Sequence, residues 1–225
     1  MDASQRFGTG PLSRAAALIY TLLIVELLFL LTSLPGLIPL VLLRRDASNL
    51  PLFALCAIPL GPALSAAIYA LHRRSADLAD LKPATAFWRG YRANLRGVLL
   101  IWIPLLVWLT IVAVNLANLS AAGVPVWWAG LLVGVMVGVT LWGINALVIT
   151  SLFAFRARDV ARLALHLLGA VPIVALGNAG VLALAAGVTA FSSEAVLALL
   201  GSVLALALLR TSGPLIGRVR KEFTA

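Results

Sequence analysis

The chain has 225 residues, of which 62% are hydrophobic and only 11% are charged, and its mean hydropathy is +1.07. Soluble domains carry about 25% charged residues, so this composition excludes an ordinary soluble domain and indicates a membrane protein. The single cysteine, Cys56, excludes a disulfide framework within the chain and a cysteine-based metal site.

Six apolar segments have about the length that a helix needs to cross the hydrocarbon core of a bilayer. In chain order they cover residues 15–36, 50–71, 98–118, 127–152, 170–191 and 194–210. The first is too long for the apolar region of a signal peptide, so we expect it to be retained as a span. The sequence therefore predicts an all-α membrane protein: a polytopic bundle of about six transmembrane helices over residues 15–210, flanked by an N-terminal segment, 1–14, and a basic tail, 211–225.

The basic residues predict an orientation for this bundle. Fifteen of the 17 Lys and Arg residues lie before the first span, in the loops at about 72–97 and 153–169, or from Arg210 to the C-terminal end. Six crossings place these segments on one side, and only Arg44 and Arg45 fall on the other. The positive-inside rule then predicts a multi-pass protein of the bacterial cytoplasmic membrane with both termini in the cytoplasm.

The first basic loop contains the sequence AFWRGYRANLRG at residues 86–97. Its aromatic rings can rest at the depth of the lipid headgroups while its arginines meet anionic lipid, each contributing about 1 kcal/mol. We therefore predict a short interfacial helix that contacts lipid or a partner, and we do not expect nucleic-acid binding. The residues concerned are Trp88, Arg89, Tyr91, Arg92 and Arg96.

A second amphipathic element is expected at residues 155–168. Arg158 and Arg162 are four residues apart, and an apolar stripe at helical spacing lies opposite them. We expect these two arginines as well to face lipid or a partner. That stripe consists of Val160, Leu163, Ala164 and Leu167.

Several polar or helix-breaking residues fall near the middle of the predicted spans. Glu26 lies about 16 Å along the first span, and Asn145, Asn178 and the Gly61–Pro62 pair lie about 12–15 Å from the basic end. Two interpretations stay open. These groups could line one small cavity at the membrane midplane, as in transporters with broken helices, or they could only join helices by hydrogen bonds.

The fourth span repeats glycine at intervals of four residues, at Gly130, Gly134 and Gly138. Such a row lets another helix approach closely, and we expect packing within the bundle or, as the alternative, against a second protomer. No catalytic triad or phosphate-binding loop is present, and the two histidines lie far apart, so we expect no cofactor and no metal.

Three segments, taken in order, resemble the YesL-like family of small bacterial membrane proteins, a domain of unknown function. They are PLGPALSAAIYALHRR (59–74), FWRGYRANLRGVLLIW (87–102), which has an Asn before the third span, and FAFRARDVARLALHLLGAVPIV (153–174). Genes of this family often adjoin those of sugar ABC transporters. The resemblance therefore implies a non-enzymatic accessory of carbohydrate uptake or its control, with a sugar permease as a candidate partner.

Two other functions remain open at this stage. The protein could be a small secondary transporter that uses the region around Glu26 and the broken second span. It could also be a membrane enzyme acting on a lipid-linked sugar, although no acid–base pair in the sequence supports that alternative.

Overall fold

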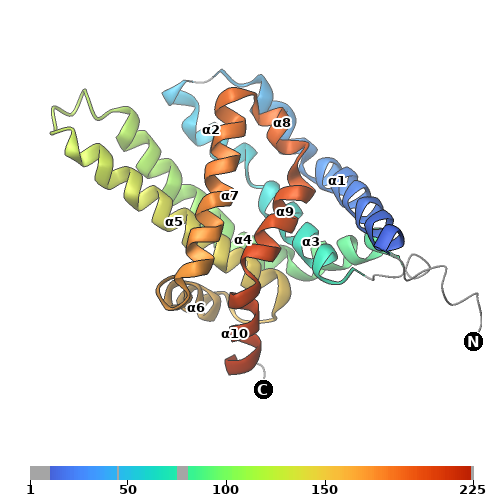
Figure 1. Ribbon diagram of the computed structural model, residues 1–225. Coiled ribbons are helices and arrows are strands. Elements are labelled where there is room, and N and C mark those ends of the chain that lie inside the picture. The colour runs from blue at the N-terminus through green and yellow to red at the C-terminus, as the bar shows by residue number, and fades with distance from the viewer. Residues whose placement is uncertain (1–10, 45, 75–80, 224–225) are drawn as a thin grey trace, which may run out of the picture.

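The computed structural model describes residues 11–44, 46–74 and 81–223 (Figure 1). This part of the chain contains ten α-helices and one short 3-10 helix, and it contains no strand. The predicted all-α membrane fold is confirmed. Most of the predicted N-terminal segment, 1–14, lies outside the described residues.

Four of the described helices are each long and apolar enough to cross a membrane. They are α1 (Pro11–Leu42), α4 (Pro83–Ala117), α5 (Trp127–Leu152) and α7 (Pro172–Phe191). Two further helix pairs have sufficient length and apolar character when each pair is taken as one bent span. They are α2 (Leu50–Cys56) with α3 (Leu60–His72), bent by 43°, and α9 (Gly201–Thr211) with α10 (Gly213–Phe223), bent by 55°. The bundle therefore has between four and six spans.

The second predicted span is broken between α2 and α3, as its prolines predict. Pro59 lacks the N–H that an unbroken helix needs at that position, and the chain bends there. At the break, the carbonyl of Ala57 accepts a hydrogen bond from the backbone N–H of Leu60 at 3.2 Å and another from Nε1 of Trp102 at 3.0 Å. Before α2, the side chain of Asp46 caps the 3-10 helix η2 (Ala47–Asn49) by accepting from the backbone N–H of Ser48.

The sixth predicted span, 194–210, is not one helix. It falls on α8 (Glu194–Ala198) and α9, which the two residues Leu199 and Leu200 separate. A Cβ on Gly201 would meet the ring of Phe29, so the first turn of α9 lies directly against α1.

Residues 86–97 do not form the separate interfacial helix that we expected. Those residues form the first part of α4, which continues without a break into the third span. Gly90 and Gly97 lie inside this helix, where they let neighbouring side chains of α3 and α5 approach. Packing therefore outweighs the low helix propensity of glycine here.

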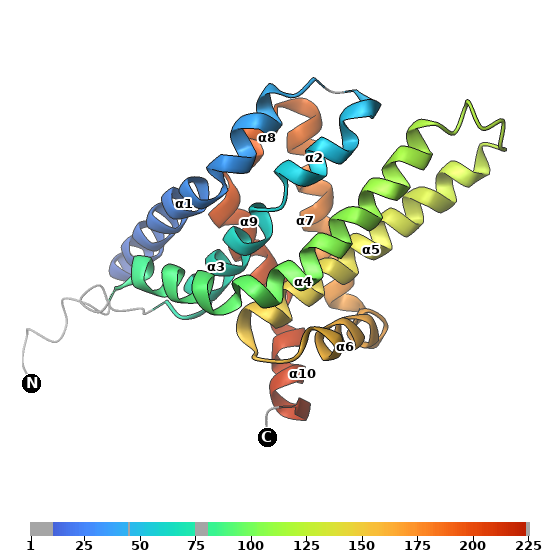
Figure 2. The ribbon, with the colours of Figure 1, turned by 180° about the vertical axis from the view of Figure 1, so that it is seen from behind.

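The second expected amphipathic element is present as α6 (Ala157–Ala170). Val160, Ala164 and Leu167 are buried, whereas Arg158 and Arg162 are exposed. In Figures 1 and 2, α6 lies across the same end of the bundle as α10. The predicted amphipathic helix is confirmed, and its interfacial position stays a prediction.

The helix α3 forms the centre of the bundle. It packs against α1, α4, α5 and α9, and nine of its 13 residues are buried. Alanine side chains at positions 63, 66, 67 and 70 are completely or almost completely buried. Because these side chains are small, four helices can approach α3 closely.

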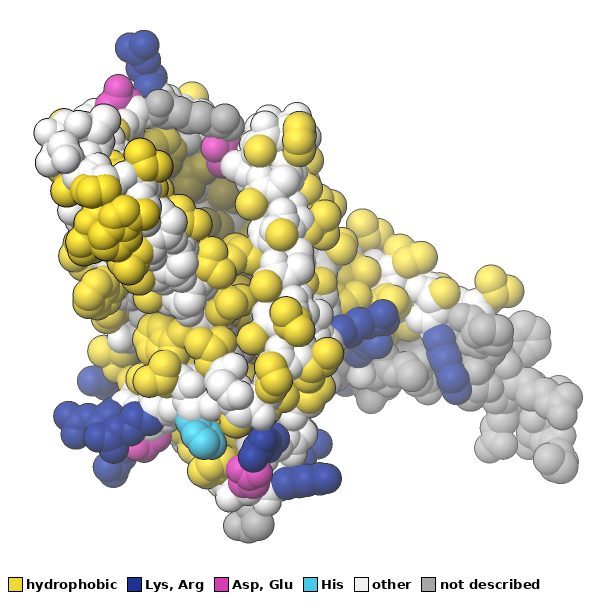
Figure 3. Space-filling view, turned by 60° about the vertical axis from the view of Figure 1, so that its left-hand side comes forward, with side chains coloured by type: hydrophobic (Ala, Val, Ile, Leu, Met, Phe, Trp, Pro, Cys, Tyr) yellow, Lys and Arg dark blue, Asp and Glu magenta, His cyan; other side chains and the backbone are white. Residues whose placement is uncertain are grey.

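The hairpin of α4 and α5 diverges from the other helices toward its tip (Figures 1 and 2). The buried residues of α5 begin only at Gly143, and its first 16 residues contain none. Trp127 and Trp128 stack at the exposed start of α5, with ring centroids 4.9 Å apart. Lys and Arg side chains gather at the opposite end of the molecule, called the basic end from here on (Figure 3).

Candidate functional site

Asn145 and Asn178 meet inside the bundle. The Asn178 amide donates to Oδ1 of Asn145 at 3.2 Å, and the hydroxyl of Thr211 donates to Oδ1 of Asn178 at 2.6 Å. Both asparagines are buried, and Nδ2 of Asn145 has no hydrogen-bond acceptor among the described residues. This cluster joins α5, α7 and the end of α9 by side-chain hydrogen bonds.

Glu26 occupies a different place, at the break between α8 and α9. Its Oε2 accepts the backbone N–H of Ser202 at 2.6 Å, in the first turn of α9. The N-terminus of a helix carries a partial positive charge, so a carboxyl oxygen is a suitable partner there. The other oxygen, Oε1, is buried and accepts no hydrogen bond from the described residues.

The Gly61–Pro62 pair lies in a third location, where α3 crosses α4. A Cβ on Gly61 would come within 2.6 Å of Cδ1 in the Trp102 ring. The same indole donates to the carbonyl of Ala57, so Trp102 of α4 connects directly to the break before α3. Among the described residues, no hydrogen bond joins this pair or Glu26 to the two asparagines.

A third polar cluster lies between α3, α4 and α5 and was not singled out as a site by the sequence reasoning. Ser151 donates to Oγ of Ser65 at 2.9 Å, and Asn94 donates to the carbonyl of Ser151 at 3.0 Å. Asn94 is the asparagine within the segment 87–102 that carries the family resemblance. Its position in that segment was the one signal available from the sequence.

An apolar cavity of about 330 Å³ lies between α1, α3 and the α4–α5 hairpin on one side and α7, α8 and α9 on the other. The recess is visible in the upper part of Figure 3, with hydrophobic walls. Phe29, Trp102 and Gly201 contribute to its lining, and Glu194 lies among the lining residues as the single acidic one. The cavity can hold hydrocarbon, and it does not include Glu26 or either buried asparagine.

The predicted basic-aromatic segment forms part of the surface at the basic end. Arg89, Arg92 and Arg96 are exposed, and Trp88 is 38% exposed. Its aromatic residues are not all at the surface, since Phe87 is completely buried and stacks on Tyr91, with centroids 6.4 Å apart. The segment is thus anchored by Phe87, whereas its three arginines are exposed.

The glycine row of α5 does not pack as expected within the bundle. A Cβ added at Gly130, Gly134 or Gly138 would have no heavy atom within 4 Å. These glycines lie on the part of α5 that diverges from the other helices. Packing of the row against a second protein chain remains a prediction.

Comparison with known proteins gives one match. No curated protein and no solved structure matches the chain. The model of a family described as "Protein of unknown function, DUF624" matches residues 22–116, from the middle of α1 almost to the end of α4. This range contains the segments 59–74 and 87–102, whose helices pack on each other. Over α1 to α4 the chain is therefore similar to a family without an assigned function.

Proposed function

We propose that this protein is a non-enzymatic accessory of another protein in the bacterial cytoplasmic membrane, with both of its termini in the cytoplasm. The sugar permease of an ABC transporter is the first candidate partner, because the YesL-like resemblance implies that genomic context. The distribution of basic residues supports the orientation, since Lys and Arg gather at one end of the bundle.

The divergent α4–α5 hairpin is the observation that carries this proposal. Its outer part has exposed apolar side chains, including Val107, Trp108 and Val135, and the glycine row beside them faces open space. In a bilayer, helices associate through close van der Waals packing, for which small residues provide the room. A helix of a partner protein can therefore pack along α5 more closely than along any leucine-rich surface.

Site-specific photo-crosslinking tests this proposal. A photoreactive phenylalanine analogue is placed at Gly134, seven residues from the outer end of α5. As a control, a second one is placed at Leu184, seven residues from the outer end of α7. We expect an adduct with an ABC permease subunit from Gly134 in native membranes, and none from Leu184. An adduct with a second copy of this chain, or the same products from both positions, would contradict the accessory function.

A small secondary transporter is the second candidate, supported by the position of Glu26. One carboxyl oxygen caps a half-helix inside the bundle while the other lacks a hydrogen-bond partner among the described residues. Broken helices whose N-termini face a bound group are typical of transporter sites. In this function, Oε1 accepts a hydrogen bond from a solute hydroxyl or takes up the proton that is transported with the solute.

Proteoliposomes containing a pH-sensitive dye distinguish this candidate from the first. Sugars are added one at a time under a proton gradient. If Glu26 couples sugar movement to proton movement, one sugar should cause a pH change that Glu26→Gln abolishes. Glu222→Gln serves as the control, because Glu222 pairs with Arg218 at the surface of the basic end. A pH change that is equal in both variants would exclude Glu26 as the coupling group.

A further inference from the structure

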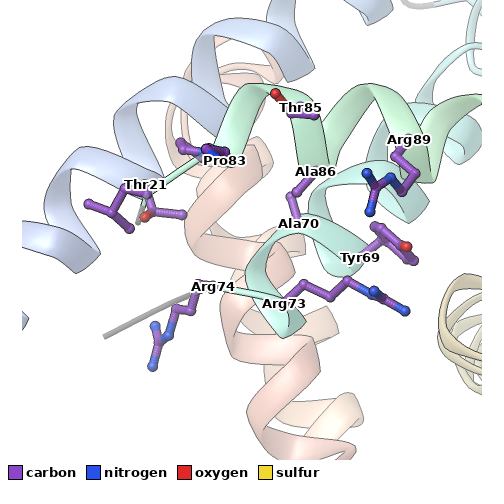
Figure 4. A pocket seen from close by; sticks show the side chains of 11 residues that line it. Thr21, Tyr69, Ala70, Arg73, Arg74, Pro83, Thr85, Ala86 and Arg89 are labelled. Carbon is purple, nitrogen blue, oxygen red and sulfur yellow. The ribbon is translucent and has the colours of Figure 1, made fainter. Parts of the chain in front are cut away.

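A pocket of about 360 Å³ opens at the basic end, between α1, α3 and the start of α4 (Figure 4). It is separate from the apolar cavity and from the three polar clusters. Its polar lining comes from three helices and from the chain that leads into α4: Thr21, Tyr69, Arg73, Lys82, Thr85 and Arg89. Arg74 also lines it.

Among the described residues, no acidic group balances the charge of this pocket. Four of its lining residues, Arg73, Arg74, Lys82 and Arg89, are cationic, and none of its described lining residues is acidic. Within the described ranges, no carboxylate forms an ion pair with any of the four. Four like charges around one concavity create a positive potential that attracts an anion.

The Tyr69 ring lies between two of these arginines. The Arg73 guanidinium lies over the ring, 4.9 Å from its centroid, and Arg89 lies across the ring from it in Figure 4. Gly90, next to Arg89, packs so closely that a Cβ there would come within 2.7 Å of the Tyr69 ring. Each of the two guanidinium groups presents a planar set of N–H donors that matches the oxygens of a phosphate.

The start of α4 adds a second source of positive charge. This helix of 35 residues begins at Pro83, has no side-chain cap at its N-terminus and has no acidic residue in its first turn. Its unsatisfied N–H groups and its dipole favour an anion at this end. The hydroxyl of Thr85, in the same turn, is a further donor.

We propose that this pocket binds a phosphate ester, with the headgroup phosphate of an anionic phospholipid as its first source. The pocket lies where the apolar bundle meets the basic end, which is the depth of headgroup phosphates in a bilayer. A soluble sugar phosphate or glycerol phosphate carries the same group and is the other source. The proposal is independent of the accessory function, because it concerns α1, α3 and the start of α4 rather than the outer part of the hairpin.

Native mass spectrometry of the full chain in detergent tests the proposal. The probes are phosphatidylglycerol and, as a phosphate-free control, diacylglycerol with the same acyl chains. We expect one retained phosphatidylglycerol per chain. Because each cation near an anionic group contributes about fivefold to affinity, the double variant Arg73→Gln/Arg89→Gln should bind about 30-fold more weakly.

A matched control removes the same charge elsewhere on the basic end. Arg158→Gln/Arg162→Gln changes two exposed arginines of α6, and phosphatidylglycerol retention should stay within about twofold of the unaltered chain. Arg73→Lys/Arg89→Lys keeps the charge and should retain most of the binding. If the double glutamine variant does not fold, Lys82→Gln, at an exposed position before α4, should still lose about fivefold.

The source of the phosphate is decided by a second titration, with glycerol 1-phosphate in lipid-free detergent. Binding of glycerol phosphate without retention of phosphatidylglycerol, sensitive to the Arg73 and Arg89 changes, would support the site and identify a soluble ligand. Equal retention of diacylglycerol, or binding that the α6 variant weakens as much as the pocket variant, would overturn the proposal.

Discussion

Glycine has opposite roles in two regions of the molecule. Where α4 crosses α3 and α5, Gly90 packs against the Tyr69 ring and Gly143 packs against Leu105, so that a side chain at either position would collide with its neighbour. In the outer part of the α4–α5 hairpin, Gly130 and Gly134 face open space. The same residue type allows close helix packing in one region and leaves a helix surface without a partner in the other.

Polar side chains show the same contrast. Toward the basic end, Asn94 and Asn178 form hydrogen bonds that join different helices. In the outer half of the hairpin, Asn115 and Asn118 donate to carbonyls of their own helix, four residues earlier. Polar residues therefore connect different helices near the basic end. In the outer part of the hairpin they bond only to nearby backbone groups.

The largest expected effect on stability comes from adding a side chain at a glycine that packs tightly against its neighbours. Gly90→Ala places a Cβ against the Tyr69 ring, and we expect the free energy of unfolding to fall by about 1–3 kcal/mol. Gly134→Ala, in open space, should leave it unchanged or raise it by up to about 1 kcal/mol. Denaturant unfolding in detergent measures both. An equal loss of unfolding free energy in the two variants would show that the two regions pack alike.

A smaller effect is expected from the buried asparagine cluster. Asn178→Ala removes three side-chain hydrogen bonds and leaves Asn145 without its donor, which should cost about 1 kcal/mol of unfolding free energy. Asn115→Ala removes only a hydrogen bond within its own helix and should change stability by less than about 0.5 kcal/mol. The thermal midpoints of the two variants compare them directly, and a greater loss in Asn115→Ala would reverse the contrast.

The smallest effect is expected from a single hydroxyl between helices. Ser151→Ala breaks the hydrogen bond to Ser65 and should cost about 0.6 kcal/mol, the average for such bonds inside a bilayer. Thr140→Val removes a hydroxyl that bonds within α5 and should have no measurable cost. Amide hydrogen exchange of α3 gives a second readout, because it should rise only in Ser151→Ala.

The sequence predicted the features that local chemistry determines. Segment length and hydropathy predicted the long spans, the prolines predicted the break before α3, and helical periodicity predicted the buried stripe of α6. Each of these depends on residues close together in the chain. They could therefore be recognised without knowing which helices are neighbours.

The incorrect predictions depended on contacts between distant residues. No proline marks the break between α8 and α9 in the sequence. At this break, Gly201 packs on Phe29, and the N–H of Ser202 donates to Glu26, which lies 176 positions earlier. Nothing in the spacing of Gly130, Gly134 and Gly138 distinguishes a packed row from an open one. Likewise, a cationic pocket assembled from three helices was not visible as a motif.

The length of the hairpin also has a consequence for its fit to a bilayer. The 35 residues of α4 span about 52 Å, well beyond a hydrocarbon core of about 30 Å, and the hairpin runs obliquely to α7 (Figure 2). A helix longer than the hydrocarbon core is accommodated by tilting. The oblique course of the hairpin therefore fits its length to the bilayer, so the lipid around it needs neither to thicken nor to thin.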